Sequence, residues 1–177
     1  MLDFREICAE ELENVTRLFS KDWALIAAGD TRSANVMVGG WGGAGYLWKK
    51  PVISCVIRPQ RYTFELVEKH ERFSLCFLPE KYRAAMQLCG TQSGRDTDKF
   101  AATGLTPAFF EGVPFVAESR LVIIARKMYA DDLKKERFID KEPLRFYEAG
   151  DFHRVYICEA ERILLRQQGK DVYDDKE

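Results

Sequence analysis

The chain has 177 residues, a length that favours one domain with a hydrophobic core of its own. Apolar residues make up 46% and charged residues 31%, an ordinary composition for a globular protein. The net charge of −1 argues against the strongly basic surface that nucleic-acid backbones require, and the longest apolar runs are too short to span a bilayer.

Residues 1–20 are predicted to form an N-terminal amphipathic helix, because Leu12, Val15, Leu18 and Phe19 recur at helical spacing. The first residues are acidic and lack the cationic and apolar parts of a signal peptide. The five cysteines are widely spaced, odd in number and without a C-x-x-C pair. Reduced thiols in a cytoplasmic protein are therefore expected.

Short strands separated by helices follow along the chain. Strands are expected at 23–30, 34–38, 51–57, 73–78, 119–130 and 154–166, the latter half of the last being also compatible with a helix. Helices are expected at 64–71 with Thr63 as N-cap, at 79–90, and before Gly104. A polar tail covers 168–177. The pattern lacks the regular strand–helix alternation of parallel sheets and favours a mainly β fold, a barrel with peripheral helices, as one domain over 1–177.

A glycine-rich stretch, VGGWGGAGYLW at residues 38–48, spells the G-x-G-x-x-G of dinucleotide-binding loops with Gly40, Gly42 and Gly45. Such a loop needs a helix that opens at its third glycine. Here Pro51 and an apolar strand follow too soon for a helix. We interpret the glycines as a strand-end loop whose backbone can approach a flat partner closely, or as a bulge in a curved sheet.

Two polar segments carry groups suited to phosphate. Guanidinium groups match phosphate oxygens with two hydrogen bonds, and hydroxyl groups and free N–H groups at turns and helix starts add donors. The residues concerned are Arg58, Arg61 and Thr63 in RPQRYT, and Ser93, Gly94, Arg95 and Lys99 in SGRDTDK. The alternative is that both segments hold ordinary surface ion pairs, with Asp96 and Asp98 neutralising Arg95 and Lys99.

The chain resembles the flavin reductase-like family of FMN-binding split barrels, in its flavoredoxin-like branch. Four stretches carry the resemblance in this order: ANVMVGGWGGAGYLWKKPV, RPQRYT, CGTQSGRDTDKFAATGLTP and GDFHRVYICE. The resemblance covers roughly residues 20–160. The resemblance implies a six-stranded antiparallel Greek-key split barrel, a homodimer, and a non-covalently bound FMN near the dimer interface.

The resemblance also implies which residues bind the cofactor. Asn35, Met37 and Trp41 would face the isoalloxazine ring, while the two polar segments would bind the phosphate. His153 falls where the family often has a histidine near the flavin and the nicotinamide. It is expected to titrate near neutrality, the alternative being a histidine bonded to backbone at the end of the barrel.

Three positions depart from the family pattern. Val38 and Gly40 stand where the family usually has threonine and serine, so two hydroxyl groups are missing from the loop. Cys158 stands where glycine is usual.

The function implied is that of an NAD(P)H-dependent flavin reductase, which passes electrons from nicotinamide to flavin and onward to a flavin acceptor or redox protein. Two alternatives stay open: a flavoredoxin-type electron carrier without NAD(P)H activity, and a barrel without flavin that serves as an interaction module. With two histidines and no clustered cysteines, no metal site is expected. A catalytic cysteine is not expected either, because no activating partner is visible.

Overall fold

The computed structural model describes residues 3–12 and 14–167 and is mainly β, with short peripheral helices, as predicted. Every strand pairing is antiparallel. The strands are β1 (Phe4–Glu6), β2 (Ala24–Gly29), β3 (Ala34–Gly39), β4 (Gly42–Leu47), β5 (Lys50–Ile57), β6 (Arg72–Phe77), β7 (Pro107–Phe110), β8 (Val113–Val116), β9 (Leu121–Asp132) and β10 (Arg154–Arg166).

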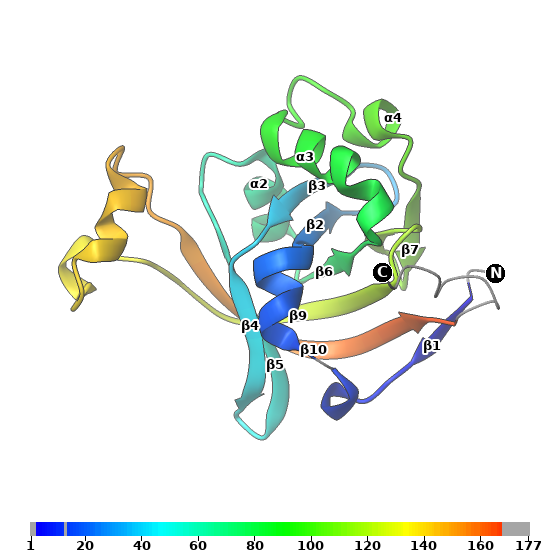
Figure 1. Ribbon diagram of the computed structural model, residues 1–177, viewed down its shortest axis with the longest axis horizontal. Helices are drawn as coiled ribbons and strands as arrows, with labels where there is room; N and C mark the ends of the chain where they lie inside the picture. Colours follow the sequence, from blue (N-terminus) through cyan, green and yellow to red (C-terminus); the bar gives the residue numbers. More distant parts are fainter. Residues whose placement is uncertain (1–2, 13, 168–177) are drawn as a thin grey trace, which may run out of the picture.

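The main sheet runs in the order β3-β2-β6-β9-β10-β5-β4, with β1 added alongside β10 (Figure 1). Its central series of six strands, from β3 to β5, curves so that these two strands approach each other. In the part of the chain that the structure describes, no ladder joins β3 to β5. The barrel is therefore split at this seam, and β1 and β4 are additions to the six expected strands.

The strand β2 separates two apolar clusters and is buried along its whole length. Ala24, Ile26 and Ala28 point into the cluster inside the curved sheet, while Leu25 and Ala27 point into the cluster outside it. The outer cluster includes residues of α3, α4 and the β7–β8 hairpin, which cover that face. Burial on both faces explains why this strand reads as a continuous apolar run rather than an alternating one.

The helices are short. They are α1 (Val15–Arg17), α2 (Tyr62–Lys69), α3 (Arg83–Thr91) and α4 (Lys99–Thr103), with a π-helical turn η2 (Leu18–Asp22) and the 3-10 turns η1 (Ala9–Glu11), η3 (Glu80–Tyr82), η4 (Lys135–Arg137) and η5 (Glu142–Tyr147). None of the helices in the described residues is long and apolar enough to cross a membrane.

The prediction of one N-terminal helix over residues 1–20 is wrong for most of that stretch. Residues 4–6 form β1, and the helix begins only after Asn14, which has a φ of 50°. A positive φ breaks a right-handed helix, so the turn at Asn14 separates η1 from α1. The apolar spacing still identified core residues, because Leu18 and Phe19 are buried. The predicted tail 168–177 lies outside the described residues.

Most of the glycine-rich stretch 38–48 is strand, and Gly40 and Trp41 form a connection at the end of a strand, where a loop was predicted. Residues 42–47 form β4, which pairs with β5 through a tight turn at Trp48 and Lys49, both with positive φ. A Cβ on Gly42 would lie 2.2 Å from the Ser54 carbonyl oxygen and 2.6 Å from the Phe19 ring. Gly42 therefore lets the strand backbone pack tightly against its neighbours, whereas a Cβ on Gly45 would meet nothing within 4 Å.

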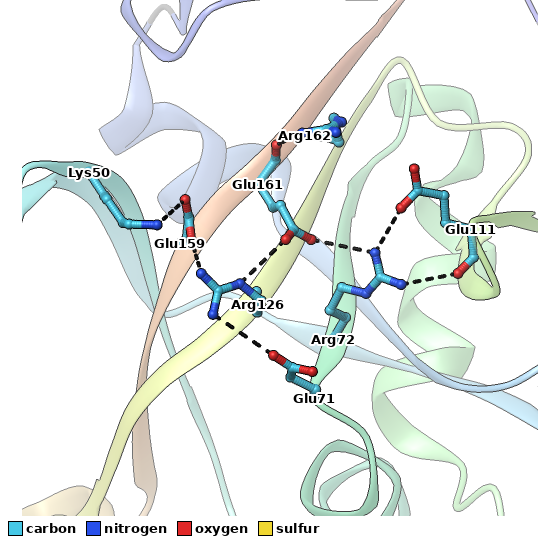
Figure 2. Close-up of polar contacts among 8 residues, drawn as sticks. All are labelled: Lys50, Glu71, Arg72, Glu111, Arg126, Glu159, Glu161 and Arg162. Atoms are coloured by element: carbon cyan, nitrogen blue, oxygen red, sulfur yellow. Dashed lines mark hydrogen bonds and ion pairs between the residues drawn. The ribbon is translucent and has the colours of Figure 1, made fainter.

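An ionic network crosses the outer surface of β5, β10, β9 and β6 (Figure 2). Arg126 on β9 pairs with Glu159 and Glu161 on β10, and Lys50 reaches Glu159 at 2.7 Å. Arg72 on β6 pairs with Glu161 at 3.5 Å. Figure 2 also shows Glu71 beside Arg126 and Glu111 beside Arg72. Arg72 and Arg126 are register partners on β6 and β9, and Glu161 pairs with both, which offsets the repulsion between these two neighbouring cations.

Candidate functional site

A cavity of about 200 Å³ opens at the seam where β3 approaches β5. Its walls come from the end of β3 and the turn after it, from β5 and the segment after it, and from the residue before β10. The lining residues are Met37, Val38, Gly39, Gly40, Trp41, Val56, Arg58, Arg61 and His153. Five of them were predicted from the sequence: Met37, Trp41, Arg58, Arg61 and His153.

Two of the three departures from the family pattern fall on this cavity, because Val38 and Gly40 are both in its wall. Valine and glycine carry no side-chain donor or acceptor. Hydrogen bonding from this stretch of the wall is therefore limited to the backbone.

The remaining predicted residues form a connected group next to the cavity. The Asn35 amide donates to the Thr63 hydroxyl at 2.8 Å, and both side chains are buried. A Cβ on Gly94 would lie 2.4 Å from Asn35 Oδ1, so the loop backbone rests on that amide. The prediction that Thr63 caps α2 is wrong, because Arg61 is the N-cap and Thr63 lies inside the helix. Thr63 instead joins α2 to β3.

Two cations, Lys99 and Arg61, lie at this junction. The Lys99 ammonium is buried and donates to the carbonyl oxygens of Val36 and Cys89, both at 2.8 Å. Arg61 donates to the Gly90 carbonyl at 3.0 Å. Burial lowers the pKa of Lys99, and the positive charge of Arg61 lowers it further.

Neither cation forms an ion pair with a carboxylate within residues 3–12 and 14–167. Both bond to carbonyls near the C-terminal end of α3, where the helix dipole favours positive charge. That partial negative charge is smaller than two full positive charges. The junction therefore keeps a positive excess and fits a phosphate or another anion.

The other charged segment is occupied by protein contacts. Arg95 pairs with Glu65, donates to the Gln60 carbonyl at 3.0 Å and lies over the Tyr62 ring. The surface ion pair considered from the sequence therefore exists for Arg95, but with Glu65 as partner rather than Asp96. For Lys99 it does not hold, since Asp98 caps α4 by accepting from the Ala101 amide at 3.2 Å.

Ser93 shapes the turn that carries Arg95. Its hydroxyl accepts from the Arg95 amide at 3.2 Å, and its carbonyl accepts from the amides of Asp96 and Thr97. The bond from Arg95 to the Gln60 carbonyl brings the SGRDTDK segment against the RPQRYT segment. The two segments predicted to act together are thus neighbours in space.

His153 has different chemistry from that predicted. Only 9% of it is exposed, and burial together with the positive charges of Arg58 and Arg61 lowers its pKa from 6.5 to about 4. The expectation that it titrates near neutrality is therefore wrong, and the imidazole is neutral at physiological pH. Its Nδ1 bonds to the Tyr147 hydroxyl at 2.9 Å, so a side chain rather than backbone holds the ring.

Sequence reasoning missed the residues between β9 and β10 that contact Trp41 and His153 in the cavity wall. Trp41 meets Phe146 edge to face, with ring centroids 5.3 Å apart, and lies 5.1 Å from the His153 ring. Burial raises the pKa of Tyr147, so its hydroxyl is also neutral. The available signal was the gathering of aromatic residues at 138–152 in an otherwise charged stretch.

Other chemistry is poorly supported around the site. Burial raises the pKa of the thiols of Cys55, Cys76, Cys89 and Cys158, which disfavours the reactive thiolate. Within the described part of the chain, no three His, Cys, Asp or Glu side chains are arranged to hold a metal ion.

The sequence matches one known protein family. Residues 16–177 match the family model described as "Flavin reductase like domain". A comparison of the sequence with curated proteins gave no significant match.

Similar solved structures cover most of the chain. An FMN-binding protein from Thermus thermophilus with bound 1-cyclohex-2-enone has 19% identity and a TM-score of 0.65, over 92% of this chain and 79% of the other. The flavoredoxin of Desulfovibrio vulgaris has 20% identity and a TM-score of 0.65, over 91% and 77%. A homologue of nitrilotriacetate monooxygenase component B from Mycobacterium thermoresistibile has 16% identity and a TM-score of 0.65, over 85% and 72%. At these identities the likeness shows the split-barrel fold.

Proposed function

The chain belongs to the flavin reductase like family, and from this premise we propose that it binds FMN at the seam cavity and passes electrons from NAD(P)H onward. The observation that carries the proposal is the positive junction of Arg61 and Lys99 beside a cavity with an aromatic rim. A flavin mononucleotide has the same two parts, a flat ring system and a phosphate.

The phosphate end would lie at the junction. Arg61 lines the cavity and spends one donor on Gly90, which leaves further N–H groups for an anion. Lys99 adds positive charge from its buried position beneath the site, and the 93–95 turn supplies backbone amides and the Ser93 hydroxyl. Asn35 and Thr63 hold this turn, α2 and β3 in one geometry, which is a positioning role.

The ring end would lie between Met37 and Trp41, with His153 at its edge. Met37 offers a soft apolar surface and Trp41 a flat one. His153 is neutral and held by Tyr147, so it can present one ring nitrogen to a ligand without adding charge. FMN, when bound, supplies the hydride and electron chemistry; the protein supplies orientation and exclusion of water.

A homodimer is part of the proposal. The cavity of about 200 Å³ is small beside the roughly 300–1,000 Å³ of most cofactor pockets. Trp41, Tyr46, Leu47 and Trp48 expose large apolar side chains on and around β4. A second copy that covered these side chains would also deepen the cavity. Light scattering of the purified protein measures this directly, and a monomeric mass at micromolar concentration would contradict it.

The absorbance spectrum of the purified protein, followed by titration with FMN, tests flavin binding. Flavin bands, or saturable quenching of FMN fluorescence, are expected. A protein that shows neither would be the barrel without flavin, used as an interaction module, and the proposal would be refuted.

Anaerobic mixing with NADH and NADPH then tests the reductase activity. Bleaching of the bound flavin by either nucleotide is expected. If neither bleaches it while a chemical reductant does, the protein is a flavoredoxin-type carrier that receives its electrons from a protein partner.

A further inference from the structure

The chain between β9 and β10, residues 133–153, forms an arm that projects from the barrel (Figure 1, yellow). The arm has a small apolar cluster of its own. Tyr147 and Phe152 stack with ring centroids 4.7 Å apart and planes at 13°, and Phe138 packs against both. Three aromatic rings bury too little area to fix the arm's position by themselves. Its attachment to the barrel therefore matters.

Arg58, just after β5, makes that attachment. Its Nη2 donates to the Phe146 carbonyl at 2.7 Å, and its Nη1 lies 3.5 Å from Asp151 Oδ2. The guanidinium carbon is 5.5 Å from the centre of the Tyr147 ring. All three partners belong to the arm. A planar guanidinium can make two directed hydrogen bonds and a contact over an aromatic face, which an ammonium cannot do together.

The residues that Arg58 holds support one wall of the cavity from behind. Tyr147 bonds to His153, and Phe146 meets Trp41, so the arm base supports two lining residues. Arg61 differs, because it donates to the Gly90 carbonyl at the end of α3 rather than to the arm. The two arginines of RPQRYT thus face different parts of the site.

The geometry points to Arg58 as a positioning residue that clamps the arm to the barrel and thereby sets the ring-recognising wall of Trp41 and His153, rather than as a ligand of the phosphate. The part of this inference that concerns ring recognition rests on the proposed flavin site. The clamp itself does not, since it joins two parts of the same chain.

Limited trypsin digestion of the ligand-free protein tests the clamp. The arm has exposed cleavage sites at Lys134, Lys135, Arg137, Lys141 and Arg145. Cleavage requires local opening of the backbone. Arg58→Ala and Arg58→Lys should both be cut in the arm several times faster than the parent protein. Alanine removes the guanidinium altogether, and lysine keeps the charge but cannot make the same pair of directed hydrogen bonds.

Arg72→Ala is the matched control, since Arg72 is similarly half-buried, with a side-chain exposure of 30% against 26% for Arg58, and lies on the outer network. It should leave arm cleavage unchanged. Melting curves of each variant show that the barrel is folded. Parent-like arm cleavage in a folded Arg58→Ala protein would overturn the clamp.

Titration with FMN and with riboflavin, which lacks the phosphate, tests the consequence for the ligand. Arg58→Ala should weaken binding of both by a similar factor, about tenfold, so that their ratio stays the same. Arg61→Ala should weaken FMN binding selectively. A selective loss of FMN binding in Arg58→Ala would assign Arg58 to the phosphate and overturn the inference. If the parent protein binds neither flavin, the proposed function fails, while the digestion still decides the clamp.

Discussion

His153 gives a pH dependence that follows directly from its environment. The unfolded chain has an ordinary imidazole with a pKa of 6.5, whereas the folded protein holds it near 4. Below pH 6.5 the unfolded state therefore binds a proton that the folded state does not. The sign follows from this difference: the free energy of unfolding falls as the pH falls through that window, and rises again with pH.

The magnitude follows from the two pKa values. Between about pH 7 and about pH 5, this one group should lower the free energy of unfolding by about 2 kcal/mol, and by about 3 kcal/mol once the pH is below 4. Two positive neighbours, Arg58 and Arg61, contribute to the effect. Burial makes the largest contribution.

Urea unfolding at about pH 7 and at about pH 5, followed by tryptophan fluorescence, measures the change in the free energy of unfolding. Carboxylates also titrate in acid and contribute to the loss in both proteins. Their contributions cancel when the loss of His153→Gln is subtracted from that of the parent protein, so this difference is the informative quantity. His153→Gln should lose about 2 kcal/mol less than the parent between the two pH values. His70→Gln, at the other histidine, controls for the loss of an imidazole elsewhere in the chain. Equal losses in the parent and His153→Gln would refute a neutral buried imidazole.

Two further predictions concern the anion site and the glycine-rich strand. Arg61→Ala should raise the Kd for FMN by about 10- to 100-fold, the scale of a hydrogen bond to a charged group, and leave riboflavin binding nearly unchanged in fluorescence titrations; equal losses for both would contradict a phosphate contact. Gly42→Ala should lower the free energy of unfolding in urea by about 1–3 kcal/mol, because its Cβ would overlap Ser54 and Phe19, whereas Gly45→Ala should be close to neutral. Similar effects at the two glycines would contradict the close approach at Gly42.

Strands were predictable from the sequence where burial alone decides the pattern. The apolar runs of β2, β5 and β6 and the long β9 and β10 appear where expected, since each supplies a row of side chains to a core. The N-terminal stretch shows the limit of this reasoning. Helical spacing gave the right core residues there, but the positive φ at Asn14 and the pairing of β1 with β10 are set by tertiary contacts.

The candidate site was predictable in its parts but not in its connections. The residue types of Arg61 and Lys99 indicate an anion site, and the structure brings them together without carboxylate partners in the described residues. Arg58 bonds to Phe146 in the arm, about 90 positions further along the chain, and His153 bonds to Tyr147, 6 positions before it. No periodic pattern in the sequence reveals either contact. Burial of His153 and the nearby charges of Arg58 and Arg61 arise only in the folded protein, so the lowered pKa of the imidazole could not be predicted from the sequence.

The arm begins and ends at one pair of facing residues. Asp132 and Arg154 are register partners on β9 and β10, their side chains are joined at 2.7 Å and 3.0 Å, and the ladder continues one step further, from the Leu133 amide to the His153 carbonyl. A hairpin turn of a few residues could therefore link the two strands directly. The barrel and the arm that supports Trp41 are thus encoded by separable stretches of the chain. This modular arrangement allows residues 133–153 to change in length and content while the strand pairing beneath them stays the same.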